Sequence, residues 1–68
     1  MITEIGIAAG DIWHYLDQKG SATVEQIVKG IGQPRDLLLM SLGWLAREGH
    51  VTVEGPETGF KSYLSRKS

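Results

Sequence analysis

The sequence predicts an α+β domain in which three helices are followed by a β-hairpin. The run from Leu42 to Val51 carries leucines at helical spacing and then reaches Gly49, which suits the left-handed conformation that ends helices. Val51 and Val53 bring β-branched residues directly after it, as strands do. Two further amphipathic segments lie upstream, so the chain passes from helical to strand periodicity near its carboxyl end.

Length and composition narrow the class of protein. A chain of 68 residues has room for one domain, and its 41% hydrophobic and 22% charged residues are typical of a globular protein rather than a disordered one. The absence of cysteine excludes disulfides and thiolate metal sites. Glu4 interrupts the apolar stretch at the amino end, and no run approaches a membrane span. We therefore predict a cytoplasmic protein with no signal peptide and no membrane association.

The first predicted helix covers residues 3 to 18, with Gly20 just beyond its end. Its core-facing positions recur at the 3.6-residue period and are Ile5, Ala8, Ala9, Ile12, Tyr15 and Leu16. Gly6 and Gly10 share another stripe with Trp13, and each glycine costs about 1 kcal/mol of helix stability relative to alanine. Two interpretations remain open: a neighbouring element of the same chain packs closely there, or the helix of a partner subunit does.

A second helix is predicted over residues 24 to 29, because Thr23 and Gln26 have the spacing of a capping box. Gly30-Ile31-Gly32 is predicted to form a tight turn. Pro34 suits the first position of a third helix that runs to residue 48. A helix, a short glycine turn and another helix form the helix-turn-helix arrangement.

The carboxyl end is predicted to form the hairpin, with strands at residues 50 to 54 and 60 to 64 joined by a loop at 55 to 59. The domain therefore spans residues 1 to 64, and residues 65 to 68 form a polar tail. The expected core draws on all three helices and both strands: Ile5, Ile12, Leu16, Ile27, Leu38, Leu42, Leu45, Val51 and Leu64.

Two stretches of the chain resemble a known family. Residues 5 to 16 read IGIAAGDIWHYL and residues 42 to 49 read LGWLAREG, and both are similar to motifs of small stand-alone winged helix-turn-helix proteins of unknown function. Met40 and Ser41 depart from the motif, where a residue such as alanine is usual. The resemblance covers most of the chain. It implies a winged helix fold with a general DNA-binding role, and it brings no catalytic or ligand-binding residues.

In DNA-binding relatives of this fold the third helix lies in the major groove, so its exposed polar residues decide what it reads. Here the predicted outer face consists of Asp36, Met40, Gly43 and Arg47, of which only Arg47 is a cation. The net charge is −1, whereas dedicated nucleic-acid binders are usually basic. We therefore predict a transcription-regulatory domain with weak, mostly nonspecific affinity for double-stranded DNA. Its candidate DNA contacts are Gln33, Arg35, Arg47, Lys61 and Lys67.

Apolar residues in excess of the predicted core favour a different role. The core face of the third helix already holds three leucines, so four further apolar residues of that helix cannot all face inward. Either the first helix and the hairpin cover Trp44 or Leu39, or these residues stay exposed and form a contact surface. The alternative function is a protein-interaction or homodimerisation module without DNA binding. Its candidate interface residues are Gly6, Gly10, Trp13, Leu37, Leu39, Met40 and Trp44.

No residue pattern predicts catalysis. His14 and His50 are the only histidines and lie far apart in the sequence, which favours surface or half-buried histidines over metal ligands. Gly30-Ile31-Gly32 lacks the further glycine of a dinucleotide fingerprint, and the loop at 55 to 59 lacks a Walker lysine. We therefore predict that the protein is not an enzyme and uses no cofactor or metal, and no small-molecule site is evident in the sequence.

Overall fold

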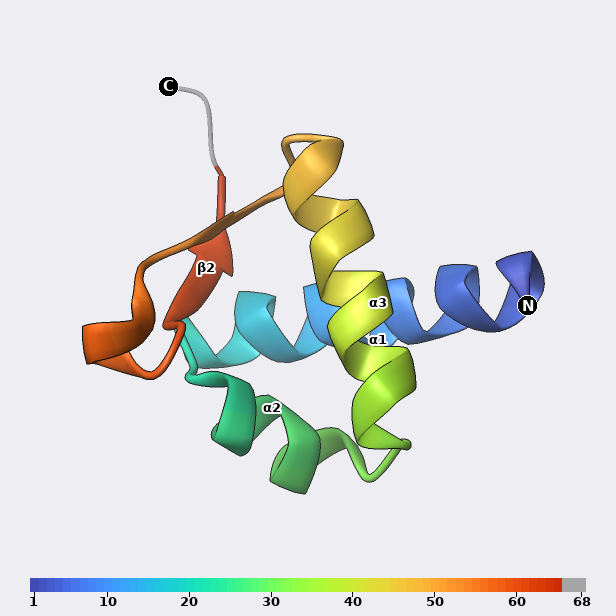
Figure 1. Cartoon of the computed structure of the whole chain (residues 1–68), viewed down its shortest axis with the longest axis horizontal. Coiled ribbons are helices and arrows are strands. Elements are labelled where there is room, and N and C mark those ends of the chain that lie inside the picture. Colours follow the sequence, from blue (N-terminus) through green and yellow to red (C-terminus); the bar gives the residue numbers. More distant parts are fainter. Residues whose placement is uncertain (66–68) are drawn as a thin grey trace.

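Three helices and a two-stranded antiparallel sheet make up the fold, in the order that the sequence predicts (Figure 1). The structure is a computed structural model that describes residues 1–65. Its elements in chain order are α1 (Ile2–Lys19), α2 (Val24–Ile31), α3 (Arg35–Arg47), β1 (Val51–Val53), a 3₁₀ turn η1 (Pro56–Thr58) and β2 (Ser62–Leu64). Figure 1 shows α3 crossing α1, with the sheet beside the carboxyl-terminal half of α1.

The turn between α2 and α3 is shorter than predicted. α2 continues through Gly30 and Ile31 and ends only at Gly32, which adopts a φ of 77° and donates its amide N–H to the Val28 carbonyl. Gly30 is thus a helical residue. Its missing side chain serves packing, because a Cβ there would overlap the Tyr15 ring. The prediction of a turn at Gly30 was wrong. The glycine is required by the close approach of Tyr15 from α1, and this contact is not visible in the local sequence.

The two ends that flank this turn follow local sequence rules. The capping box is confirmed. The backbone N–H of Gln26 donates to Thr23 Oγ1 at 3.2 Å, and the backbone N–H of Thr23 donates to the side-chain Oε1 of Gln26 at 2.9 Å. α3 begins at Arg35, with Pro34 as its N-cap residue rather than its first helical residue. It ends one residue earlier than predicted, and Gly49 follows with a φ of 81°.

Eight of the nine predicted core residues are buried. Ile5 is the exception. Figure 1 shows the first turns of α1 extending past α3. Ile5 belongs to these turns and is half-buried beside a hollow that opens to solvent. Three buried residues with small side chains, Ala8, Ala9 and Ser41, suit the extensive contact between α1 and α3. Ser41 donates its hydroxyl to the Leu37 carbonyl at 2.8 Å, so its burial leaves no unpaired polar atom.

The hairpin is shorter than predicted on both strands. β1 and β2 pair antiparallel over three residues each, with Val51 opposite Leu64 and Val53 opposite Ser62. The predicted second strand started at Phe60, which is wrong because Phe60 has a φ of 55°. This left-handed conformation is uncommon for a bulky residue and costs on the order of 1 kcal/mol. The Phe60 side chain is 49% exposed in the loop instead of lying in the sheet.

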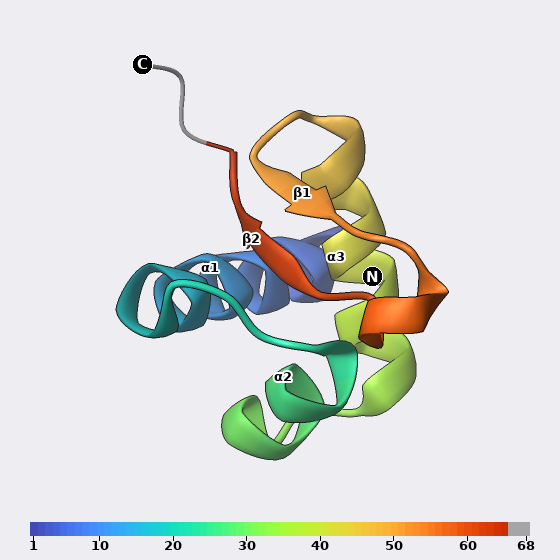
Figure 2. The same cartoon turned by 90° about the vertical axis from the view of Figure 1, so that its left-hand side faces the viewer.

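A third segment joins the sheet, and the sequence did not predict it. Ala22, between α1 and α2, donates its N–H to the Ser62 carbonyl at 3.0 Å and accepts from the Ser62 N–H at 2.8 Å. The first amide of α2, that of Val24, donates to the Gly59 carbonyl at 3.2 Å. These bonds tie the hairpin to the helix-turn-helix unit. Figure 2 shows β2 between β1 and this connecting segment.

Candidate functional site

Two of the predicted DNA contacts are already engaged within the chain. The Gln33 side-chain amide, in the turn before α3, donates to Asp11 Oδ2 at 3.4 Å and ties the turn to α1. Arg35, at the first position of α3, has its Nη1 2.5 Å from Glu25 Oε2 on α2. In this fold the start of the corresponding helix enters the major groove. Glu25 therefore engages one donor of the cation that lies nearest to the expected contact and offsets part of its charge.

The other predicted cations do not join Arg35. Arg47 lies in the last turn of α3 and Lys61 at the end of the hairpin loop. Both are exposed, and within residues 1–65 neither side chain makes a hydrogen bond or an ion pair. Lys61 borders a shallow hollow together with Asp17 of α1. Lys67 lies outside the described residues. The structure thus spreads these cations over α3 and the hairpin rather than gathering them into one patch.

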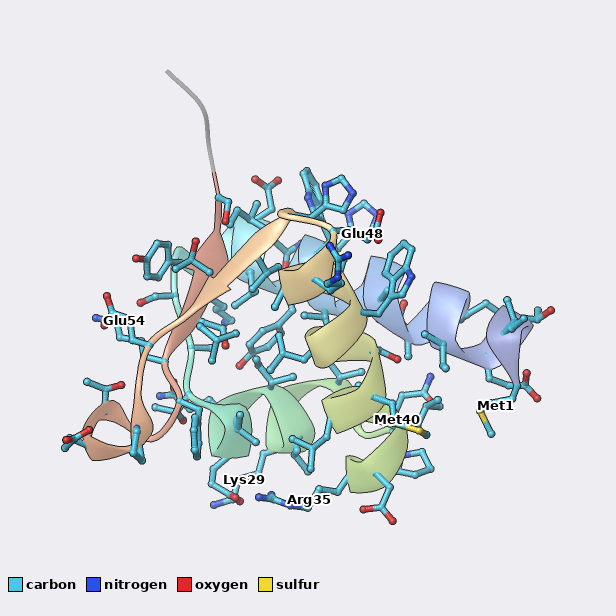
Figure 3. The ribbon with its side chains drawn as sticks, turned by 45° about the horizontal axis from the view of Figure 1, so that its top comes forward. Met1, Lys29, Arg35, Met40, Glu48 and Glu54 are labelled. Atoms are coloured by element: carbon cyan, nitrogen blue, oxygen red, sulfur yellow. The ribbon has the colours of Figure 1, made fainter. Side chains whose placement is uncertain are left out.

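Carboxylates are interspersed with the cations. Asp36 lies exposed in the first turn of α3. Figure 3 shows Lys29 and Arg35 at the end of the molecule formed by α2 and the start of α3, whereas Glu54 projects from the hairpin. At the start of α1, the terminal amino group lies 2.9 Å from Glu4 and holds the pKa of that carboxyl below its usual value. The described surface therefore lacks the continuous cationic stripe that tracks a phosphate backbone.

Exposed apolar residues gather along one side of α1 and α3. Trp13 is 37% exposed and Trp44 is 48% exposed. Gly6 and Gly10 have open space where a Cβ would stand, so no other element among residues 1–65 packs closely against them. The interpretation that the glycines serve packing within the chain is therefore wrong. We call these four residues, together with the exposed Ile2, the tryptophan face.

Two shallow hollows make up the tryptophan face, and they share Gly6 and Trp44. One lies between the two tryptophans over Gly6 and Gly10, and the other lies beside Ile2. None of the residues that line either hollow is a Lys, Arg, Asp or Glu. Aromatic side chains without formal charges are the composition of the core of a protein interface.

The remaining apolar candidates on α3 divide between surfaces. Leu37 is half-buried and packs against the core, whereas Met40 is 46% exposed and Leu39 is 41% exposed. The expectation that α1 and the hairpin cover Trp44 or Leu39 is therefore wrong. The hairpin is too short and is bound to the segment around Ala22, so it does not reach over these side chains.

Leu39 belongs to a second surface, between α3, the start of α2 and the hairpin. We call it the wing groove. It is a half-open hollow of about 510 Å³ whose apolar walls are Val24, Leu39, Leu42, Val53 and Phe60. Among residues 1–65, Glu25 and Arg35 are the only charged residues that line it, and Gly43 also lines it, with open space where a Cβ would stand. Sequence reasoning missed this groove because its walls come from three elements.

The two histidines accompany the tryptophans instead of forming a site together. The ring centroids of His14 and Trp13 lie 5.6 Å apart, and those of His50 and Trp44 lie 6.4 Å apart. In the described part of the chain, no group of three or more metal-ligating side chains is placed to hold an ion. Over the same residues, no helix combines the length and the hydropathy that a membrane span requires.

A helix-turn-helix followed by a hairpin defines the winged helix class. The chain belongs to the family described as winged helix-turn-helix domain (DUF2582), whose model matches residues 1–64. It is also 36% identical over 52 residues to the uncharacterized protein MJ1608 of Methanocaldococcus jannaschii, an alignment that covers 74% of each chain. No solved structure matches the chain. The family assignment confirms the resemblance found in the two sequence motifs.

Proposed function

We propose that this winged helix is a non-catalytic, cytoplasmic protein-interaction module that self-associates through the tryptophan face. The hollow between Trp13 and Trp44 supports the proposal most directly, because no part of the described chain fills it. Gly6 and Gly10 line it, and each lowers the stability of α1 by about 1 kcal/mol relative to alanine without a close contact within the chain. The close approach of a second chain accounts for that cost.

A second copy fits this face because the face carries both a projecting ring and a hollow. In a two-fold symmetric dimer the same patch meets itself, so Trp44 of each copy enters the hollow over Gly6 of the other. The lack of charged lining residues removes the repulsion that arises when a charged patch meets its own copy. The exposed parts of the two tryptophans and Ile2 amount to on the order of 400 Å² per protomer, about half of a standard interface. We therefore expect micromolar association.

Light scattering across a hundredfold dilution of the full chain tests self-association. The mass per particle is expected to lie above 7.5 kDa at high micromolar concentration and to fall towards 7.5 kDa on dilution. The tryptophan emission is expected to move to longer wavelength over the same range, because both indoles become more exposed. A constant mass of 7.5 kDa at high micromolar concentration contradicts the proposal.

Gly10→Ala separates folding from association. Within residues 1–65, the new methyl group meets no atom within 4 Å beyond the adjacent residues and the local backbone of α1, so the variant is expected to gain about 0.5–1 kcal/mol of folding stability from helix propensity. The same methyl group obstructs the approach of a second copy, so the dissociation constant is expected to rise. Thermal melts of the dilute protein and sedimentation equilibrium measure the two effects.

Gly43→Ala is the matched control for this variant. Gly43 is also a helical glycine with open space at its Cβ, but it lines the wing groove and not the tryptophan face. It is expected to stabilise folding by a similar amount and to leave association unchanged. If both variants associate like the parent, the glycines of α1 do not lie in an interface.

A second function, weak and nonspecific binding of double-stranded DNA in transcription regulation, is favoured by the helix-turn-helix and by Arg47 and Lys61. Their side chains have no partner within residues 1–65 and are free to reach phosphates. Each neutralised phosphate contributes about 0.9 to the slope of log affinity against log salt. Two cations per chain give a slope of about −2 for a monomer and about −4 for a dimer, which is a shallow dependence compared with dedicated binders.

Arg47→Gln and Lys61→Gln are each expected to reduce this salt slope by about 1 per chain, with equal losses on unrelated duplexes. Lys19→Gln is the control, because it removes the same charge from the last turn of α1, where the ammonium lies 5.8 Å from the Tyr15 ring. Fluorescence anisotropy with a labelled duplex at several salt concentrations measures the slopes. A nanomolar, sequence-selective complex at physiological salt is the result that would exclude weak, nonspecific binding.

A further inference from the structure

We infer that the wing groove binds a small organic acid, whose apolar body lies against Leu39 and Phe60 and whose carboxylate is held by Arg35. Its volume of about 510 Å³ lies within the range of small-molecule sites, about 300–1,000 Å³. Such sites combine apolar walls with a few polar groups that fix orientation, and this groove has five apolar wall residues and a single ion pair. It shares no lining residue with the tryptophan face, so the inference is independent of self-association.

The apolar walls are held in place by backbone contacts. Phe60 keeps its left-handed φ of 55° between two residues, Gly59 and Ser62, whose backbones are hydrogen-bonded to the segment before α2 and to its first residue. On one side the Gly59 carbonyl accepts from the Val24 amide, and on the other Ser62 forms its two-bond bridge with Ala22. Strained residues of this kind cluster at functional sites such as ligand clamps. The half-exposed Phe60 ring is therefore positioned by its backbone to cover one side of a flat or short-chain ligand.

Arg35 supplies the donors that hold an anion at the groove, and Glu25 offsets part of its charge. Arg35 directs Nη1 to Glu25, which leaves other donors of the guanidinium fork for a second carboxylate. Its side chain is 49% exposed, so a ligand reaches these donors without displacing Glu25.

An amide-shift titration of the ¹⁵N-labelled full chain with 4-phenylbutyrate tests the inference, with 4-phenylbutanamide as the uncharged partner of the same shape. The acid is expected to give saturable shifts at the amides of Leu39, Gly43, Val53 and Phe60, while the indole N–H signals of both tryptophans stay in place. The amide is expected to bind about tenfold more weakly, because it loses the charge-assisted hydrogen bonds to Arg35.

Four variants separate the contribution of the charge from that of the ring. Arg35→Gln is expected to lower the affinity for the acid to that for the amide, whereas Arg47→Gln removes the same charge from α3 outside the groove and is expected to change nothing. Glu25→Gln is expected to tighten acid binding, because it removes a like charge beside the carboxylate. Phe60→Asn keeps a residue that tolerates the left-handed conformation and is expected to weaken both ligands. Thermal melts confirm that each variant folds.

Four results would overturn the inference. Equal affinities for the acid and the amide would mean that Arg35 does not select an anion. Equal losses of affinity for the acid in Arg35→Gln and Arg47→Gln would lead to the same conclusion. Shifts centred on the tryptophan face place the ligand elsewhere. Shifts at Leu39 and Phe60 on dilution without any ligand mean that a second copy covers the groove.

Discussion

Leu42→Ala is expected to lower the free energy of unfolding by about 2–5 kcal/mol. Leu42 is 6% exposed and lies on the inner side of α3 between Leu38 and Leu45. Removing its side chain takes apolar atoms out of the core and leaves a cavity that the crossing helices cannot close fully. Because native domains are stable by only about 5–15 kcal/mol, this is a large share of the total. Urea denaturation followed by circular dichroism measures the loss, and a midpoint at least about 8 °C lower is expected in a thermal melt.

Leu39→Ala is the matched control for the core variant. It removes the same atoms from the same helix, but Leu39 is 41% exposed on the wing groove. The expected loss is within about 1 kcal/mol, since the side chain already contacts water on one side. Losses of the same size in the two variants would mean that the inner face of α3 is assigned wrongly.

The elements that the sequence predicts well are those determined by neighbours along the chain. Leu38, Leu42 and Leu45 recur at three- and four-residue spacing, and the helical period alone places them on one face. The capping box of α2 is equally local, because Thr23 and Gln26 bond to each other. Helix order and most of the core could be predicted from such patterns.

The features that the sequence could not predict depend on contacts between distant segments. In the sequence alone Gly30 is typical of a turn, whereas in the fold it is a helical residue that packs against the Tyr15 ring. The bridge between Ala22 and Ser62 joins the connection between α1 and α2 to the hairpin, forty residues later in the chain, and no periodicity encodes it. The same bridge fixes the hairpin and thereby forms one wall of the wing groove. A prediction from local spacing therefore gives the helices but not the surfaces between them.

The candidate DNA contacts show the same limit for a functional surface. Gln33 and Arg35 read as available polar groups in the sequence, but Asp11 and Glu25 lie beside them in the fold. These partners come from α1 and α2, so their proximity follows from how the helices pack and not from spacing. Charge counted along a chain overestimates the charge that a surface presents.

Trp44→Ala is expected to raise the dissociation constant of the proposed dimer by about 30-fold, which corresponds to about 2 kcal/mol. Trp44 borders both hollows of the tryptophan face and is 48% exposed in the monomer. Tryptophans that enter a hollow on the partner are typical of the few residues that dominate binding energy. Sedimentation equilibrium gives the dissociation constants. The chain has two tryptophans, so the emission of the variant reports on Trp13 alone.

Phe60→Asn is the control for this variant, because Phe60 is 49% exposed and also aromatic, yet it lies on the wing groove. If exposed aromatic surface drives association without regard to place, both variants dissociate alike. If the tryptophan face is the interface, only Trp44→Ala dissociates, and Trp13 emission no longer changes on dilution. The second outcome is expected, because the tryptophan face has no charged lining residue to desolvate when it meets its own copy, whereas Glu25 and Arg35 line the wing groove.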